Sequence, residues 1–238
     1  LRLTDSPILV ALAFGMYFLP SFFLGPFTGT LADRVNRKKI LVLVHSVSLV
    51  ANLMLATLVI ADAVQVWAVL AIVLCIGMGI SFMMPSTQTL VYDIVGPGDA
   101  QNGLALLPAA FKLVGIVGAV LGGILIETVG MGSAFLVGAA THGVGVLTIS
   151  FMRYTPGNNV AVSESVLANL VEGFKFFART PTLLWIVGMT MIVECLAYGS
   201  QALLPIFADS GVLDVGASGL GMMNGAIAFG GMVGGLTL

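Results

Sequence analysis

The chain is a succession of long apolar segments separated by short polar links. The segments are too long for typical strands, and each reaches or exceeds the length of about 20 mostly apolar residues that a helix needs to cross a bilayer. The glycines and prolines inside them are tolerated in lipid-embedded helices. The pattern therefore predicts seven transmembrane helices, over residues 7–32, 40–61, 65–91, 103–127, 133–152, 181–207 and 217–238.

The link over residues 153–180 is longer than the others. It contains a polar stretch, TPGNNVAVSES, followed by LANLVEGFKFFAR, in which apolar residues recur at helical spacing. This spacing predicts an amphipathic helix that either lies at the membrane surface or docks on the protein as a short soluble helix. Its apolar positions are Val166, Leu167, Leu170, Val171, Phe174 and Phe177.

Composition favours a membrane protein over a soluble one. Hydrophobic residues make up 58% of the chain and charged residues 8%, whereas soluble domains carry about 25% charged residues. Cys75 and Cys195 both lie inside apolar segments, so no disulfide framework is indicated. The chain begins with Leu1 and ends inside an apolar segment, and we expect it to be a fragment of a longer protein.

The distribution of Lys and Arg predicts the topology. The links 33–39 and 153–180 are basic, whereas the links after the second, fourth and sixth apolar segments carry neither Lys nor Arg. Alternation of the helices puts the links 33–39, 92–102 and 153–180 on one side, although 92–102 itself has no Lys or Arg, and the positive-inside rule makes that side cytoplasmic. Arg2 would fall on the outer side and is the one exception.

The most charged stretch is GTLADRVNRKK, residues 29–39, in which five of eleven residues are charged. Gly29 allows two helices to approach closely, and Asp33 at a helix end can pair with an arginine or cap a neighbouring helix. We expect the basic residues Arg37, Lys38 and Lys39 to face the anionic inner leaflet. A loop that only sets topology would need neither Gly29 nor Asp33.

This stretch resembles the signature loop of the major facilitator superfamily (MFS) of transporters. In the family, the loop is thought to latch the two halves of the transporter and to break and re-form during the cycle. Asn36 stands where the family usually has Gly, and we expect it to support the same left-handed turn. The residues that match the family pattern are Gly29, Asp33, Arg34, Arg37, Lys38 and Lys39.

Three further stretches are similar to bacterial exporters of the macrolide-efflux and siderophore-export type. They are TDSPILVALAFGMYFLPSFFLGPFTGTLADR, MMPSTQTLVYDIVGPGDAQNGLAL and LPIFADSGVLDVGASGLG. The resemblance implies an all-α membrane protein, an MFS helix bundle truncated to about helices two to eight of twelve. It also implies a division into an N-terminal bundle over residues 1–152, a cytoplasmic connector over 153–180 and the start of a C-terminal bundle over 181–238.

The chain departs from the antiporters of this family at two positions. Ala119 replaces the proline of the glycine-rich fifth helix, and Ile76 stands where many proton antiporters have an arginine. A proline-dependent bend and proton coupling through that arginine are therefore unsupported. The glycines that remain allow close helix contact, either in a gating role or as ordinary packing or dimer contacts. They are Gly115, Gly118, Gly122 and Gly123.

Polar residues at membrane depth are the candidates for substrate contact, because charge inside a spanning helix is costly and usually functional. Glu194 is the clearest, since Thr190, Tyr198 and Gln201 share its helix face and form a polar stripe with it. We expect this stripe to face a water-filled cavity, where Glu194 could bind a cationic or polar substrate group or carry a proton. The alternative is a Glu satisfied by a neighbouring helix.

The other candidates are weaker. Gly77, Ser81, Met84 and Gln88 form a second stripe, for which interhelical hydrogen bonds are the simpler interpretation. Lys112 lies about 13 Å into its predicted helix and either snorkels to the inner surface or faces the cavity. His45 and His142 are interpreted as packed, hydrogen-bonding residues, and Asp93 and Asp99 as helix caps.

The predicted function is ion-gradient-driven efflux of a small amphiphilic compound by alternating access, in a multi-pass protein of the cell membrane, with the bacterial inner membrane favoured. The expected partners are this substrate, membrane lipids and protons as the coupling ion. No cofactor, metal, nucleic acid or enzyme activity is indicated by the sequence. The alternatives are a lipid or lysolipid flippase of the same superfamily and a non-transporting membrane scaffold or sensor.

Overall fold

The computed structural model describes residues 6–154, 171–172, 175–176, 178–209, 213 and 215–237. The described elements are all helices, which confirms the predicted fold class. They are α1 (Pro7–Arg34), α2 (Arg37–Ile60), α3 (Val66–Thr128), α4 (Met131–Phe151), α6 (Pro181–Asp209) and α7 (Gly216–Thr237). Most of the predicted amphipathic helix lies outside the described residues.

Four of the described helices are long and apolar enough to cross a bilayer. They are α1, α2, α3 and α4, judged by length and composition. Their stretches of suitable hydropathy are Ile8–Gly25, Arg37–Ile60, Val66–Thr128 and Met131–Phe151. The chain is therefore a multi-pass membrane protein.

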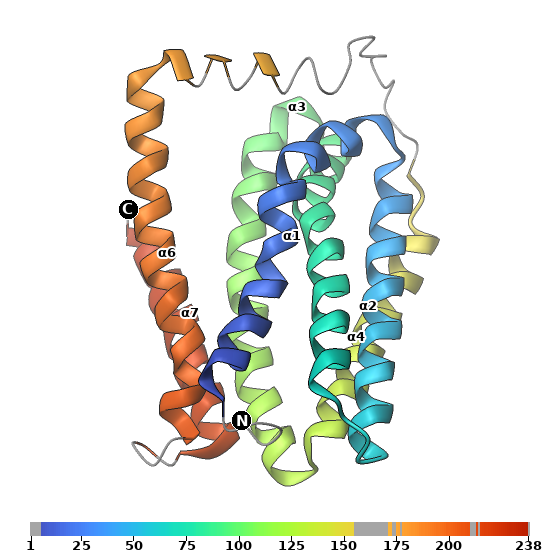
Figure 1. The fold of residues 1–238 in the computed structure, drawn as a ribbon. Coiled ribbons are helices and arrows are strands. Elements are labelled where there is room, and N and C mark those ends of the chain that lie inside the picture. The colour runs from blue at the N-terminus through green and yellow to red at the C-terminus, as the bar shows by residue number, and fades with distance from the viewer. Residues whose placement is uncertain are drawn as a thin grey trace.

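The helix α3 has 63 residues and is made of two limbs joined at Gly96. Gly96 has φ 76° and ψ 170°, a backbone conformation that residues with a Cβ rarely adopt. Pro97 follows and begins the second limb, where its missing N–H is not needed. Val91 and Val95 of the first limb lie against Gly103 of the second, and Figure 1 shows the limbs side by side.

This bend corrects one prediction about the chain. The sequence pattern indicated two helices, 65–91 and 103–127, separated by a loop over 92–102. Helical conformation instead continues through that range, and the reversal of direction is concentrated at Gly96. Both limbs are therefore several residues longer than predicted, and Lys112 of the second limb lies farther from the bend.

The helices alternate in direction, as the apolar segments predicted. Figure 1 shows α1 ascending, α2 descending, the two limbs of α3 ascending and descending, and α4 ascending. The α1–α2 link, the Gly96 bend and the end of α4 consequently lie at one end of the bundle, which we call the motif end. The cytoplasmic location of this end remains a prediction.

Close packing of α1 against α3 depends on small residues. A Cβ added at Gly77 would overlap the backbone carbonyl of Tyr17, so only glycine permits this approach. One turn along, the Ser81 hydroxyl lies 3.0 Å from that of Ser21 and donates to the Gly77 carbonyl at 2.9 Å. This part of the second polar stripe therefore faces α1, in agreement with the interhelical interpretation.

The second limb of α3 packs on α7 through another set of small residues. A Cβ at Gly123 would lie 2.6 Å from the Ala217 carbonyl oxygen, and one at Gly221 would overlap the Ala119 carbonyl. A Cβ at Gly225 would lie 3.1 Å from a Val120 methyl group. These contacts join the chain before residue 153 to the chain after residue 180.

We expect Gly123→Ala to destabilise the full-length protein by about 1–3 kcal/mol, because the added methyl group must push α7 away. Gly118→Ala in the same limb is the matched control. A Cβ there meets nothing within 4 Å, so the better helix propensity of alanine should leave stability equal or slightly raised. Thermal midpoints in detergent measure both, and equal midpoints for the two variants would contradict the α3–α7 contact.

Candidate functional site

The signature stretch folds as the end of one helix, a two-residue link and the start of the next. Gly29, Asp33 and Arg34 belong to α1, and their side chains are outside the described part of the structure. Asn36 precedes α2, and its side-chain Oδ1 accepts hydrogen bonds from the backbone N–H groups of Lys38, at 3.0 Å, and Lys39, at 3.4 Å. Asn36 is therefore the N-cap of α2.

This arrangement corrects the prediction of a left-handed Asn36. Its φ is −60° and its ψ 110°, an extended conformation. The first N–H groups of a helix have no partner within the helix, and an Asn side chain at this position supplies one. Asn36 replaces the family glycine by capping α2, without adopting a left-handed turn.

Arg37 is turned into the protein at the motif end. Its Nη1 donates to Asp93 Oδ2 at 2.5 Å, and the two side chains are only 11% and 16% exposed. Tyr154, just after α4, donates its hydroxyl to the same Asp93 oxygen at 2.5 Å and lies 3.5 Å from Arg37 Nη1. The three residues form one cluster that joins α2, α3 and the end of α4.

The cluster overturns two predictions. Arg37 was expected to face the inner leaflet, and Asp93 was expected to cap a helix. Each charge instead satisfies the other in a partly desolvated position, where an unpaired charge would be unfavourable. Burial and the hydrogen bond to Asp93 raise the pKa of the Tyr154 phenol, so the phenol remains a protonated donor at neutral pH.

Lys38 and Lys39, which follow Arg37, have different environments. Lys38 donates through Nζ to the carbonyl oxygens of Ser150 and Met152, at 2.8 Å each. A cation at these carbonyls is favourable because they end α4, where the helix dipole is negative. Lys39 is exposed and is the one of the three basic residues that can face the membrane surface as predicted.

The polar stripe of α6 is partly described. Thr190 and Glu194 are exposed, Gln201 is half-buried, and the Tyr198 side chain is outside the described part. Thr190 donates to the Ile186 carbonyl of its own helix at 2.8 Å. Among the described residues, no hydrogen bond joins one member of this stripe to another candidate residue, so its predicted role remains a prediction.

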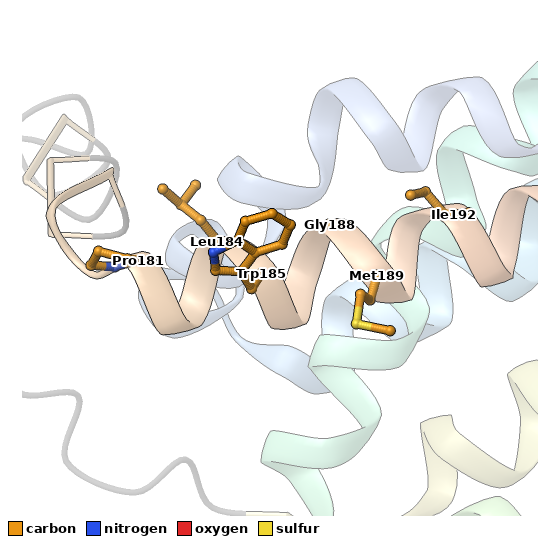
Figure 2. Close-up of a pocket in the computed structure, with 6 residues that line it drawn as sticks. All are labelled: Pro181, Leu184, Trp185, Gly188, Met189 and Ile192. Carbon is orange, nitrogen blue, oxygen red and sulfur yellow. The ribbon is translucent and has the colours of Figure 1, made fainter.

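The opposite side of α6 carries an open apolar groove of about 440 Å³. At about 100° per residue, its lining residues fall on the helix face opposite Glu194 and Thr190. Figure 2 shows the lining side chains along α6, and they are Pro181, Leu184, Trp185, Gly188, Met189 and Ile192. The helix therefore separates an apolar face from a polar one.

Lys112 joins the second limb of α3 to α7. Its Nζ donates to the Gly231 carbonyl oxygen at 2.6 Å, and the side chain is exposed. It lies fifteen residues after Pro97, about 22 Å along the helix, so it is deeper than the sequence pattern indicated. Its ammonium group thus reaches sideways to another helix, whereas the snorkelling alternative would point it to the membrane surface.

The remaining candidates have separate positions. Gln88 and Met84 are exposed on the first limb of α3. Of the four candidate packing glycines, Gly123 contacts α7, whereas a Cβ at the other three would meet nothing within 4 Å; they are Gly115, Gly118 and Gly122. In the described part of the chain, no three His, Cys, Asp or Glu side chains gather where they could hold a metal ion.

We expect Arg37→Ala or Asp93→Asn to destabilise the full-length protein by about 3–5 kcal/mol, because each leaves a partly buried charge unpaired. The double variant should be less destabilised than the sum of the two, since the charges depend on each other. Lys39→Ala, in the same motif but exposed, is the control and should not change the midpoint. Thermal unfolding in detergent measures all four, and additive effects would contradict the pair.

Comparison of the sequence with known proteins identifies the family of the chain. A family profile described as transmembrane secretion effector matches residues 2–238. The uncharacterized MFS-type transporter YfiS of Bacillus subtilis (strain 168) is 25% identical over 216 residues, 88% of this chain and 51% of YfiS. The multidrug efflux pump Tap of Mycolicibacterium fortuitum is 28% identical over 222 residues, 87% of this chain and 52% of Tap.

The chain spans about half the length of the curated relatives it matches. No solved structure matches it. The profile nevertheless covers nearly every residue, including the signature stretch and all described helices, and the relatives carry the superfamily name that residues 29–39 suggested. The chain belongs to the transmembrane secretion effector family of the major facilitator superfamily.

Proposed function

We propose that the full-length protein is a secondary active transporter that exports small amphiphilic compounds from a bacterial cell by alternating access, with protons as the coupling ion. The family assignment supports the transport class, and Tap is named as a multidrug efflux pump. The cell membrane, and in bacteria the inner membrane, is the location that fits this activity.

The observation that carries the proposal is a charge held between two helices at the middle of the second limb of α3, far from both ends of that limb. Lys112 is the one charged residue between Gly103 and Ile126 of the sequence, and its ammonium binds a carbonyl of α7. A charge so far inside a spanning helix is costly unless it serves a hydrated pathway. Because its partner is a neutral carbonyl in a helix after residue 180, the contact can break when two helix groups move apart.

The polar face of α6 supports a substrate with a polar group. Glu194 and Thr190 lie exposed on this face, whereas the apolar groove lies on the opposite face and would not line the same pathway. Glu194 is the proposed proton carrier, because a carboxylate in a hydrated path can alternate between a proton and a cationic substrate group. Lys112 would hold an acceptor group of the substrate.

The motif end supplies the proposed latch. Arg37 and Lys38 hold α2 to α3 and to α4, so the region 29–39 is anchored on one group of helices. Asp33 and Arg34, at the end of α1, are the residues of the signature stretch proposed to contact the other half of the transporter. Opening and closing of this contact would accompany each transport cycle.

We expect Glu194→Gln in the full-length protein to lower efflux driven by a pH gradient by about tenfold or more, because the amide cannot release a proton. Glu172→Gln, an exposed residue of the link, is the control and should transport normally. The assay follows export of a panel of fluorescent amphiphiles from inverted vesicles, with and without a proton uncoupler. Unchanged gradient-driven efflux in Glu194→Gln would rule out the carrier role.

Cysteine labelling tests whether the polar face of α6 is wet. We expect Thr190→Cys and Gln201→Cys to react quickly with a membrane-impermeant, water-soluble thiol reagent, because this face should line the pathway. Leu184→Cys and Ile192→Cys, from the apolar groove on the opposite face, are the controls and should react at least about tenfold more slowly, since a thiol reacts as its water-exposed thiolate. Equal rates on the two faces would favour a non-transporting scaffold or sensor.

A further inference from the structure

The antiparallel pair α2 and α4 meets along a seam of regularly spaced polar residues. Lys38, His45 and Asn52 of α2 follow one another at intervals of seven residues, close to two helical turns, and so lie on one line. Lys38 binds the last carbonyls of α4 at one end of the seam. At the other end, Ile60 packs on Gly132.

Glycines of α4 make room for these side chains. A Cβ at Gly145 would lie 3.1 Å from His45 Nδ1, and a Cβ at Gly138 would lie 2.8 Å from Asn52 Oδ1. Gly138 and Gly145 are also seven residues apart. The imidazole of His45 and the amide of Asn52 therefore fill notches in the α4 surface, which fixes the register of the two helices.

The two histidines of the sequence meet in the middle of this seam. Nδ1 of His45 lies 3.1 Å from Nδ1 of His142, and the ring centroids are 5.3 Å apart at an angle of 48°. Both side chains are half-buried. The sequence interpretation treated each histidine as an isolated packing residue, because their separation of 97 positions gives no local signal of contact.

This contact restricts how many protons the pair can hold. With both rings neutral, one Nδ1 must carry a hydrogen and the other must accept it. One added proton gives an imidazolium that still donates to its neutral neighbour. A second would place two N–H donors and two positive charges face to face, so the contact could not persist.

We propose that His45 and His142 form a proton-binding site that joins α2 to α4, distinct from Glu194 of α6. The neutral pair already shares one Nδ1–H, and the first proton that the site takes up converts the donating ring to an imidazolium that keeps this hydrogen bond. Binding of a second proton separates the rings and loosens the α2–α4 seam. The helix bundle therefore takes up protons at this site, and this uptake does not depend on the identity of the substrate.

In the described part of the chain, no charged group of α2, α3 or α4 forms a hydrogen bond or ion pair with either imidazole, so protonation of the pair depends on the interaction between the two rings. Lys38 faces the same seam but donates to α4 carbonyls, and His142 is the one ionisable residue of the α4 sequence. On α3, which packs on both helices, Asp93 is bound to Arg37 and Tyr154 at the motif end. The other ionisable residues of α3 are Cys75, Tyr92, Asp99, Lys112 and Glu127, and within the described part no hydrogen bond or ion pair joins them to either ring.

Nitrogen NMR of the full-length protein in lipid nanodiscs, labelled at histidine, tests the proposal directly. Ring nitrogen shifts distinguish the two neutral tautomers from the imidazolium, and His45→Gln and His142→Gln assign the signals. We expect one Nδ1-protonated and one Nε2-protonated ring at high pH, followed by two uptake steps separated by more than about one pH unit. In either single variant, the remaining histidine should titrate in one step at a changed pH.

Thermal stability gives a second measurement that does not depend on resolving the signals. We expect the wild-type midpoint to fall on acidification between about pH 8 and 5, and the double Gln variant to lose that fall, because glutamine can donate and accept without gaining charge. Gly138→Ala is the matched control, since it perturbs the same seam beside Asn52 but keeps both imidazoles. It should lower the midpoint equally at every pH.

Two results would overturn the proposal. One is titration of the remaining histidine in either single variant at the same pH as in the wild type, which would mean that the rings do not interact. The other is an acid-dependent loss of stability that persists in the double Gln variant, which would assign it to carboxylates such as Asp93. If the Gln variants do not fold, the wild-type NMR titration alone decides, because a single uncoupled step excludes a shared proton.

Discussion

The hydrocarbon core of a bilayer offers no water to hydrogen-bond with protein, and this constraint governs how the chain is held together. Helices satisfy their own backbone groups, but each polar side chain inside a span needs a partner from the protein. Ser81 finds Ser21, Lys112 finds a carbonyl of α7, and His45 finds His142. Each partner belongs to a different helix, so satisfying the polar group also determines which helices are neighbours.

The sequence pattern predicted the long apolar helices of the described part and their alternation, because both follow from apolar length and bilayer thickness. It placed a loop over 92–102, where helix instead continues on either side of Gly96. It also indicated the family, through the spacing of residues 29–39. It could not identify the Arg37–Asp93–Tyr154 cluster, whose members lie far apart in the sequence and have no spacing rule between them. At Asn36, local chemistry allowed either a left-handed turn or a cap, and the unpaired N–H groups of α2 selected the cap.

The two main contacts of the bundle are built from different chemistry. The α3–α7 contact consists of glycines against backbone, with one hydrogen bond from the Lys112 ammonium to the Gly231 carbonyl and one from the Ser218 N–H to the Glu127 carboxylate. The α2–α4 contact has polar side chains set into glycine notches and a lysine on the α4 carbonyls. Separating α3 from α7 breaks these two hydrogen bonds, whereas separating α2 from α4 breaks both hydrogen bonds of Lys38 and the one between the two histidines. We therefore expect relative movement within the bundle to be easier between α3 and α7.

Arg37 and Lys38 are adjacent in the chain, yet Arg37 binds Asp93 of α3 and Lys38 binds carbonyl oxygens at the end of α4. A displacement of the α1–α2 link is therefore transmitted to α2, α3 and α4 through two neighbouring residues. We expect these three helices to move together as one rigid unit. A force applied at the end of α1 would then reach all three helices through Arg37 and Lys38.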